Sequence, residues 1–216
     1  MKKIDQPFVH EDPFLQGAVR ELIEKYKCHT VLLYGSRARG DATLKSDYDL
    51  AGIRKHGRKI RVAEKRNGKF LDVFIFPEID LKRIDDQHFY MKEALVLFEK
   101  DKFGTQLMAK LRRALKKPHQ PLPADEIEAR KIWAYKMLER AEADDLEAKY
   151  RRSWLHEALL YEYFNLRKAR YWGSKESFAW LKRNDPATYR LYDRVLSQPT
   201  DLKLLKKLVD RVVTVK

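Results

Sequence analysis

The sequence predicts an α/β (α+β) fold, in which a small mixed sheet backed by helices is followed by a helical bundle. In the first half of the chain, short apolar segments rich in strand formers lie between turn signals. In the second half, apolar residues recur at helical spacing. Between the halves, residues 118–123 include three prolines, more than a helix interior or a central strand tolerates. We therefore expect two domains, residues 1–117 and 118–216.

Turn and capping residues mark the first elements of the chain. Asp12-Pro13 is typical of a helix N-cap followed by the first helical residue, and apolar residues then recur at helical spacing through Lys27. The apolar segment 31–34 predicts a strand. The stretch from Gly35 to Gly40 is interpreted as a turn that leads into one helical turn.

Two further strands and a hairpin are predicted next. Residues 47–53 and 69–76 have strand character, and Asn67-Gly68, just before the second of them, is a strong hairpin turn signal. From Asp85 to Lys117 apolar residues recur at helical spacing, which predicts helices over this range. In the second half we expect helices over 124–149, 152–172 and 174–184, one opened by Asp185-Pro186, and one capped by Thr200.

Three aspartates interrupt the predicted strands. Asp47 and Asp49 lie two residues apart, so both carboxylates should point to one face of their strand. Adjacent carboxylates repel unless a cation lies between them, and hard oxygen ligands suit Mg²⁺ bound to substrate phosphates. Asp72 is the one polar residue between Phe70 and Phe76. If its strand pairs beside the other, the three acids converge and can hold a two-metal site for phosphoryl transfer.

The residues before these acids suggest a phosphate-binding turn. Gly35 and Ser36 begin the short helix, whose unpaired N–H groups and positive dipole end can hold a phosphate. Arg37 and Arg39 are either solvated residues of this helix or phosphate ligands. We favour a phosphate role for one of them, because a guanidinium stabilises spread negative charge.

In this order, Gly35-Ser36, Asp47-x-Asp49 and Asp72 resemble the motifs of the DNA polymerase β-type nucleotidyltransferase superfamily. Gly-Ser-Arg-Ala-Arg-Gly and Ser-Asp-Tyr-Asp-Leu are most similar to its small bacterial members. The resemblance spans residues 30–76, about a fifth of the chain. It implies Gly35 and Ser36 on the triphosphate of ATP or another NTP, Asp47 and Asp49 on two Mg²⁺ ions, and Asp72 as third ligand or base.

The second half carries two weaker resemblances. A helical domain after a nucleotidyltransferase domain resembles kanamycin nucleotidyltransferase, which implies a glutamate of that domain as general base. Glu157 and Glu162 are the two we consider beside Asp72, although a solvated or salt-bridged helix acid is the commoner case. Arg151 and His156 have the spacing of the ribonuclease motif in HEPN-type domains, a spacing that also arises by coincidence on helix surfaces.

Composition narrows the class of protein. The 46 basic and 32 acidic residues give a formal net charge of +14. The single cysteine, Cys28, excludes an internal disulfide and a cysteine-based metal site. No signal-peptide core and no apolar run of membrane-spanning length is present, so we expect a cytoplasmic protein without a membrane partner. The basic stretch 54–69 is either a solvated face or an RNA-binding one; aromatic residues are not interleaved along it.

Together these features predict an enzyme, a Mg²⁺-dependent nucleotidyltransferase that moves a nucleoside monophosphate, AMP from ATP, to a hydroxyl of an acceptor. We expect the nucleotide between the two domains. An aminoglycoside-like small molecule fits the two-domain resemblance, whereas a protein or RNA acceptor of toxin–antitoxin type fits the basic charge better. The alternative hypothesis from another functional class is a non-catalytic RNA-binding module with the same fold. The oligomeric state is left open, a homodimer included.

Overall fold

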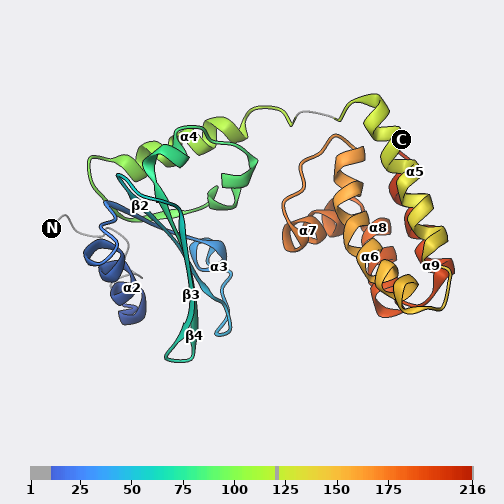
Figure 1. Cartoon of the computed structure of the whole chain (residues 1–216), viewed down its shortest axis with the longest axis horizontal. Helices are drawn as coiled ribbons and strands as arrows, with labels where there is room; N and C mark the ends of the chain where they lie inside the picture. The colour runs from blue at the N-terminus through green and yellow to red at the C-terminus, as the bar shows by residue number, and fades with distance from the viewer. Residues whose placement is uncertain (1–10, 120–121, 216) are drawn as a thin grey trace. The chain divides into compact units, whose positions relative to one another are not determined.

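The structure is a computed structural model that describes residues 11–119 and 122–215. The chain divides into two compact units, Met1–Pro118 and His119–Lys216. The first contains a mixed five-stranded sheet with helices on both faces, and the second consists of helices (Figure 1). The predicted fold class is therefore confirmed. No helix within the described ranges is long and apolar enough to cross a membrane.

The sheet has the strand order β3-β4-β2-β1-β5. β2 and β4 run parallel, and every other neighbouring pair is antiparallel. The strands are β1 (Thr30–Tyr34), β2 (Tyr48–Arg54), β3 (Ile60–Arg66), β4 (Lys69–Pro77) and β5 (Leu95–Glu99). Since β2 and β4 are parallel neighbours, their residues point to the same face in matching pairs.

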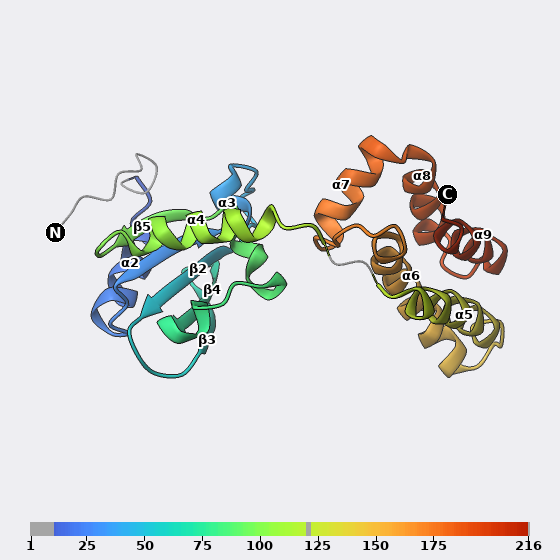
Figure 2. The same ribbon diagram turned by 90° about the horizontal axis from the view of Figure 1, so that it is seen from above.

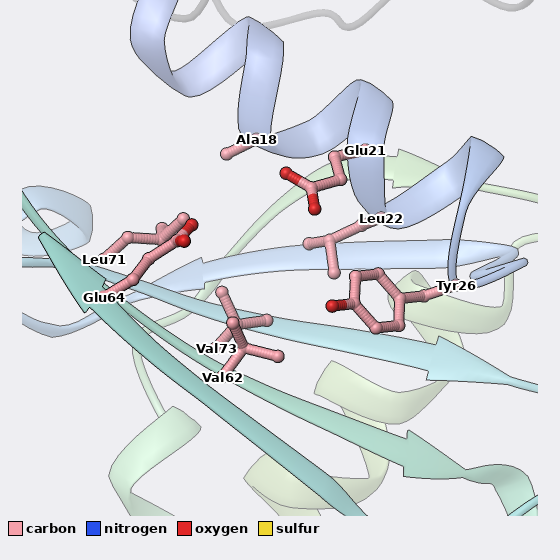
Figure 3. Close-up of a pocket in the computed structure, with 8 residues that line it drawn as sticks. All are labelled: Ala18, Glu21, Leu22, Tyr26, Val62, Glu64, Leu71 and Val73. Atoms are coloured by element: carbon pink, nitrogen blue, oxygen red, sulfur yellow. The ribbon is translucent and has the colours of Figure 1, made fainter. Parts of the chain in front are cut away.

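One face of the sheet is covered by α2 (Pro13–Glu24). The Asp12 side chain caps this helix by accepting from the Phe14 and Leu15 amides, as predicted. Figure 3 shows Ala18 and Leu22 of α2 above Val62, Leu71 and Val73 of the sheet. This face is thus the hydrophobic core of the unit. Alternate residues of β4 point the other way, which includes Asp72.

The opposite face is covered over β1 and β5 by α4 (Phe103–Leu115) (Figure 2). The approach is close at Gly104, where an added Cβ would lie 2.9 Å from Val96 Cγ1 and 3.0 Å from Thr30 Cγ2. Two 3₁₀-helices, η1 (Glu78–Leu81) and η2 (Asp86–Met91), precede β5. The outer strand β3 is left with exposed residues on this side.

The hairpin between β3 and β4 is confirmed. Arg66 pairs with Lys69, and the two residues between them have positive φ, 50° at Asn67 and 76° at Gly68. Such values are those of a two-residue turn whose twist matches the flanking strands. The turn thereby fixes the register that brings Asp72 into β4.

The prediction of helix over 85–117 is wrong at Leu95–Glu99, which form β5 and pair with β1. A short continuous apolar run does not distinguish a buried strand from a helix by periodicity. The free edge of β1 decides the outcome, because its N–H and C=O groups need partners that only a strand supplies. α4 and the short η2 are the helical parts of this range.

The second unit contains α5 (Ala124–Arg140), α6 (Leu146–Leu166), α7 (Ser174–Asn184), α8 (Pro186–Ser197) and α9 (Leu202–Val213). Its core centres on fully buried leucines of α6 and α9. The first two predicted helices are misplaced, because the break lies at 141–145, where the Asp145 carboxylate accepts from the Ala148 amide and caps α6. Asp201, not Thr200, caps α9 through the Leu204 amide.

Candidate functional site

Asp49 and Asp72 lie directly opposite each other on the neighbouring strands β2 and β4. The parallel register places both side chains on the face turned away from α2. Asp47 lies one residue before β2, so the predicted strand begins one residue too early. The structure therefore brings Asp49 and Asp72 together on the sheet and leaves Asp47 on the loop that leads into it.

The three acids interact electrostatically. The pKa of Asp49 is raised, first because the carboxyl is half-buried and then because the charges of Asp47 and Asp72 oppose its ionisation. Arg39 and Arg37 offset this effect in part. Asp49 thus lies in an excess of negative charge that nearby protein cations do not cancel.

Gly35 brings backbone against this carboxylate. It begins α3 (Gly35–Arg39) with a φ of 72°, and an added Cβ would collide with Asp49 Oδ2. Only glycine permits both this backbone conformation and this approach. The helix ends at Gly40, also left-handed, where an added Cβ would meet nothing within 4 Å. Ser36, the next residue of α3, is partly exposed.

Arg61 of β3 binds Asp72 with two contacts. Its Nε donates to Oδ1 at 2.9 Å and its Nη2 donates to Oδ2 at 2.7 Å. The guanidinium side chain is 60% exposed, so this ion pair lies at the surface and contributes little to stability. Arg61 could not be predicted as the partner of Asp72, because nothing in the sequence of β3 shows which residue of β4 its side chain contacts.

The two arginines of α3 differ in what they bind. Arg37 donates from Nη2 to the Ser46 carbonyl at 2.8 Å and from Nε to the Asp47 carbonyl at 3.1 Å. Its guanidinium carbon also lies 3.7 Å from the centre of the Tyr48 ring. Among the residues that the structure describes, the ion pairs of Arg39 are longer, 3.4 Å to Asp41 and 3.9 Å to Glu93. Arg37 therefore fastens the loop that holds Asp47, and Arg39 is the freer cation.

The three acids offer the donor atoms that Mg²⁺ binds. Carboxylate oxygens are the ligands that Mg²⁺ prefers. The pKa of Asp49 is raised first by burial and then by the charges of Asp47 and Asp72, which a cation would neutralise. Asp72, however, is held by Arg61, and within residues 11–119 and 122–215 no three His, Cys, Asp or Glu side chains form a ready-made metal-binding group. The donor chemistry fits the ion, although among the described residues the three carboxylates do not form one metal-binding group.

Two tyrosines border the acids and were not found from the sequence. Burial raises the pKa of Tyr34 far above its usual value, and the charges of Asp49 and Asp72 add to this shift. The Tyr34 ring lies 4.9 Å from that of Tyr90, centre to centre. Tyr34 directly precedes Gly35, so its position in the sequence could have indicated that it lies at the site. Tyr90 comes from η2, and no sequence pattern links it to the site.

Two of the four candidate residues of the second unit, Glu162 and Arg151, form ion pairs within that unit. Glu162 is buried on α6 and accepts from Arg130 of α5 at 2.7 Å, while Glu157 is exposed. Arg151 pairs with Glu147 at the surface, whereas His156 is buried. Five helical residues correspond to about 500° of rotation, which sets these two side chains about 140° apart around the helix axis.

No protein-family model and no curated protein matches this chain. Among solved structures, it is similar to the crystal structure of a nucleotidyltransferase-like protein from Exiguobacterium sibiricum 255-15. The likeness covers 92% of this chain and 74% of that chain, with 15% sequence identity and a TM-score of 0.44. The function proposed below rests on the residues of this chain.

Proposed function

We propose that the first unit is a Mg²⁺-dependent nucleotidyltransferase that moves a nucleoside monophosphate, AMP from ATP, to a hydroxyl of an acceptor. One observation supports this most: Asp49 and Asp72 lie side by side in register, with the backbone of Gly35 against the Asp49 carboxylate. Three segments that are separate in the sequence thus form one acidic site beside a glycine backbone. Structural carboxylates are normally paired with cations or hydrogen-bond donors, and Asp49 is crowded by acids instead.

Each residue has a part in the transfer. Asp47 and Asp49 would hold Mg²⁺, which when bound neutralises phosphate charge and orients the α-phosphate. Gly35 and Ser36 would contact the outer phosphates, and Arg39, as the freer arginine, would add a cation there. Arg37 positions Asp47 through its two backbone contacts.

In the reaction the acceptor oxygen forms a bond to the α-phosphorus while the bond from that phosphorus to pyrophosphate breaks. Pyrophosphate leaves with the bonding electron pair, and the hydroxyl proton passes to a carboxylate. We assign the proton to Asp72, because it lies beside Asp49. Glu162 is hydrogen-bonded to Arg130 inside the second unit, and Glu157 is exposed on the same helix. To serve as base or ligand, the Asp72 carboxylate would release the Arg61 guanidinium or use one oxygen while the other stays bound to it.

Charge bears on the acceptor. A cationic aminoglycoside prefers an acidic surface, while this chain has a net charge of +14. We therefore favour an anionic acceptor over a cationic one.

The test is Mg²⁺-dependent pyrophosphate release from labelled ATP with a panel of aminoglycosides, tRNA and lysate proteins. Asp49→Asn and Asp47→Asn should each lower turnover by roughly 10³-fold, the scale of losing one preorganised electrostatic group. Asp80→Asn is the matched control, because Asp80 is exposed on η1. Turnover that survives both substitutions at the active-site aspartates, with melting curves unchanged, refutes the proposal.

A further inference from the structure

Among the described residues, the face of the β3–β4 hairpin that turns away from α2 is exposed toward the hairpin turn, whereas Phe76 at its other end is buried. β3 is an edge strand, and its residues Arg61 and Lys65 are exposed. On β4 they lie opposite Phe74 and Phe70, respectively. We define the aromatic–basic face as the following residues: Lys59, Arg61, Lys65, Phe70, Phe74 and Tyr90.

On this face cations and rings alternate. The Lys65 ammonium lies 5.2 Å from the centre of the Phe70 ring, and the Arg61 guanidinium carbon lies 5.1 Å from that of Phe74. Lys59 lies 5.2 Å from the same Phe74 ring. Along the sequence the basic stretch had no interleaved aromatics. Strand pairing supplies them, because Arg61 and Lys65 of β3 each lie opposite a phenylalanine of β4 across the ladder.

Two of these rings are open to solvent. Phe70 is 52% exposed and Tyr90 is 42% exposed. Tyr90 lies 6.2 Å from Phe74, centre to centre. Within the described residues, neither Lys59 nor Lys65 has a carboxylate partner. A face with accessible rings and uncompensated positive charge matches a ligand that offers flat bases and phosphates together.

The same face contains the acids of the proposed active site. Asp72 lies between Phe70 and Phe74 on one side of β4, with about 7 Å between successive residues on that side. Tyr90 borders Tyr34, which lies next to Gly35. A nucleic-acid strand with one base stacked on Phe70 could therefore extend along this face to Asp72 and Asp49.

We propose that the aromatic–basic face binds a single-stranded nucleic acid and presents its terminal hydroxyl to Asp49 and Asp72 as the acceptor. The binding stands on the face alone, while the role of the hydroxyl rests on the proposed nucleotidyltransferase function. Bases stack on Phe70 and Tyr90, and Lys59 and Lys65 contact phosphates. An acidic peptide would satisfy the lysines but offers no flat base for the rings.

The test is fluorescence anisotropy of the full chain with labelled 12-nucleotide strands of RNA and DNA, without ATP or Mg²⁺. Phe70→Ala should weaken binding roughly tenfold, the effect of one lost stack, and Phe70→Tyr should restore it. Tyr150→Ala is the matched control, because Tyr150 is 73% exposed but belongs to the second unit. The tighter of the two strands identifies the sugar that the face prefers.

Salt dependence tests the lysines. Lys65→Ala should reduce the slope of log affinity against log salt by about 0.7, the value for one phosphate contact on a single strand. Lys203→Ala, an exposed lysine of α9, should leave the slope unchanged. Equal binding of an RNA duplex or of polyglutamate, or equal losses in Phe70→Ala and Tyr150→Ala, would overturn the proposal.

The two proposals fail separately. If ATP is turned over on another acceptor while Phe70→Ala and wild type bind strands equally, this inference is wrong and the nucleotidyltransferase stands. If strands bind through Phe70 but no strand is extended and no pyrophosphate appears, the transfer is refuted, and with it the acceptor role of the strand. Extension of a strand that is lost in Asp49→Asn and reduced in Phe70→Ala supports both.

Discussion

Each unit of the molecule contains a partly buried aspartate, and the two are held in opposite ways. Asp185, which caps α8, accepts from the Thr188 amide and hydroxyl, from the Tyr163 hydroxyl and from Arg211. Although burial opposes ionisation, these donors lower the pKa of Asp185 to about 2. Burial and two neighbouring carboxylates raise the pKa of Asp49. Burial alone therefore does not identify a functional site. The distinguishing feature is whether the groups around the carboxylate are hydrogen-bond donors and cations, as at Asp185, or other carboxylates, as at Asp49.

Glu162 sharpens this distinction. Burial raises its pKa as it does for Asp49, but Arg130 opposes the shift through an ion pair at 2.7 Å. At Glu162 the largest neighbouring charge is a cation, whereas at Asp49 the two largest are carboxylates. We therefore interpret the acid of α6 as part of the bundle and the acid of β2 as part of a site.

After the losses expected at Asp47 and Asp49, the largest expected effect separates Gly35 from Gly40. Both have φ above 70°, so alanine costs each of them about the same backbone strain, roughly 1 kcal/mol. Only at Gly35 does the new Cβ collide with the Asp49 carboxylate. Gly35→Ala should lower turnover about 100-fold or more, since a misplacement of about 1 Å at reacting groups has that cost. Gly40→Ala should retain turnover, and equal losses in the two variants would remove the glycine–aspartate contact from the mechanism.

The next effect is on stability, and it has opposite signs in the two units. Asparagine still caps a helix but cannot be ionised. A pKa that falls from 3.8 to about 2 corresponds to about 2 kcal/mol, which Asp185→Asn should lose at pH 7. In the wild type this contribution is present above about pH 4 and is lost as pH falls toward 2. The variant and wild type should accordingly converge near pH 2 in urea unfolding.

Asp49→Asn should affect the free energy of unfolding in the opposite direction to Asp185→Asn. Because the folded pKa is raised, the ionised carboxylate destabilises the folded protein at pH values above that pKa, and the penalty vanishes below the unfolded value of 3.8. Without Mg²⁺, this variant should unfold at pH 7 with a free energy no lower than that of the wild type. A clear loss would show that Asp49 stabilises the fold, and the contrast with Asp185 would be lost.

A smaller effect distinguishes the arginines of α3. Arg37→Ala removes two backbone contacts and the stacking on Tyr48, so we expect about 1–2 kcal/mol lower stability and lower kcat through a loosened Asp47. Arg39→Ala should leave stability unchanged and weaken ATP binding several-fold. Isothermal titration with a non-hydrolysable ATP analogue beside thermal melts measures both. Unchanged ATP affinity in Arg39→Ala would reject its phosphate role.

Local signals predicted the parts of the first unit that bear on the site. Asp12-Pro13 and Asn67-Gly68 act through neighbouring backbone, so their effects are visible in the sequence. The strand at Leu95–Glu99 was missed, because its structure is decided by the distant edge of β1. Arg61 and the pairing of Phe70 with Lys65 were missed for the same reason, since both depend on the β3–β4 register. Contacts across strands carry the information that spacing along the chain lacks.

The smallest expected effect concerns His156, whose Nε2 has no hydrogen-bond partner among the described residues. Burial, and then the charge of Arg152, lowers its pKa. The unfolded chain therefore takes up a proton below about pH 6.5 that the folded bundle resists, so stability is present above that pH and declines below it, by at most about 1.4 kcal/mol per pH unit. His156→Leu should flatten this decline in urea unfolding between pH 7 and 5.5. If His156→Ala instead abolished an RNA cleavage activity of the wild type, the second unit would hold a site of its own, and the contrast between a chemical unit and a structural one would fail.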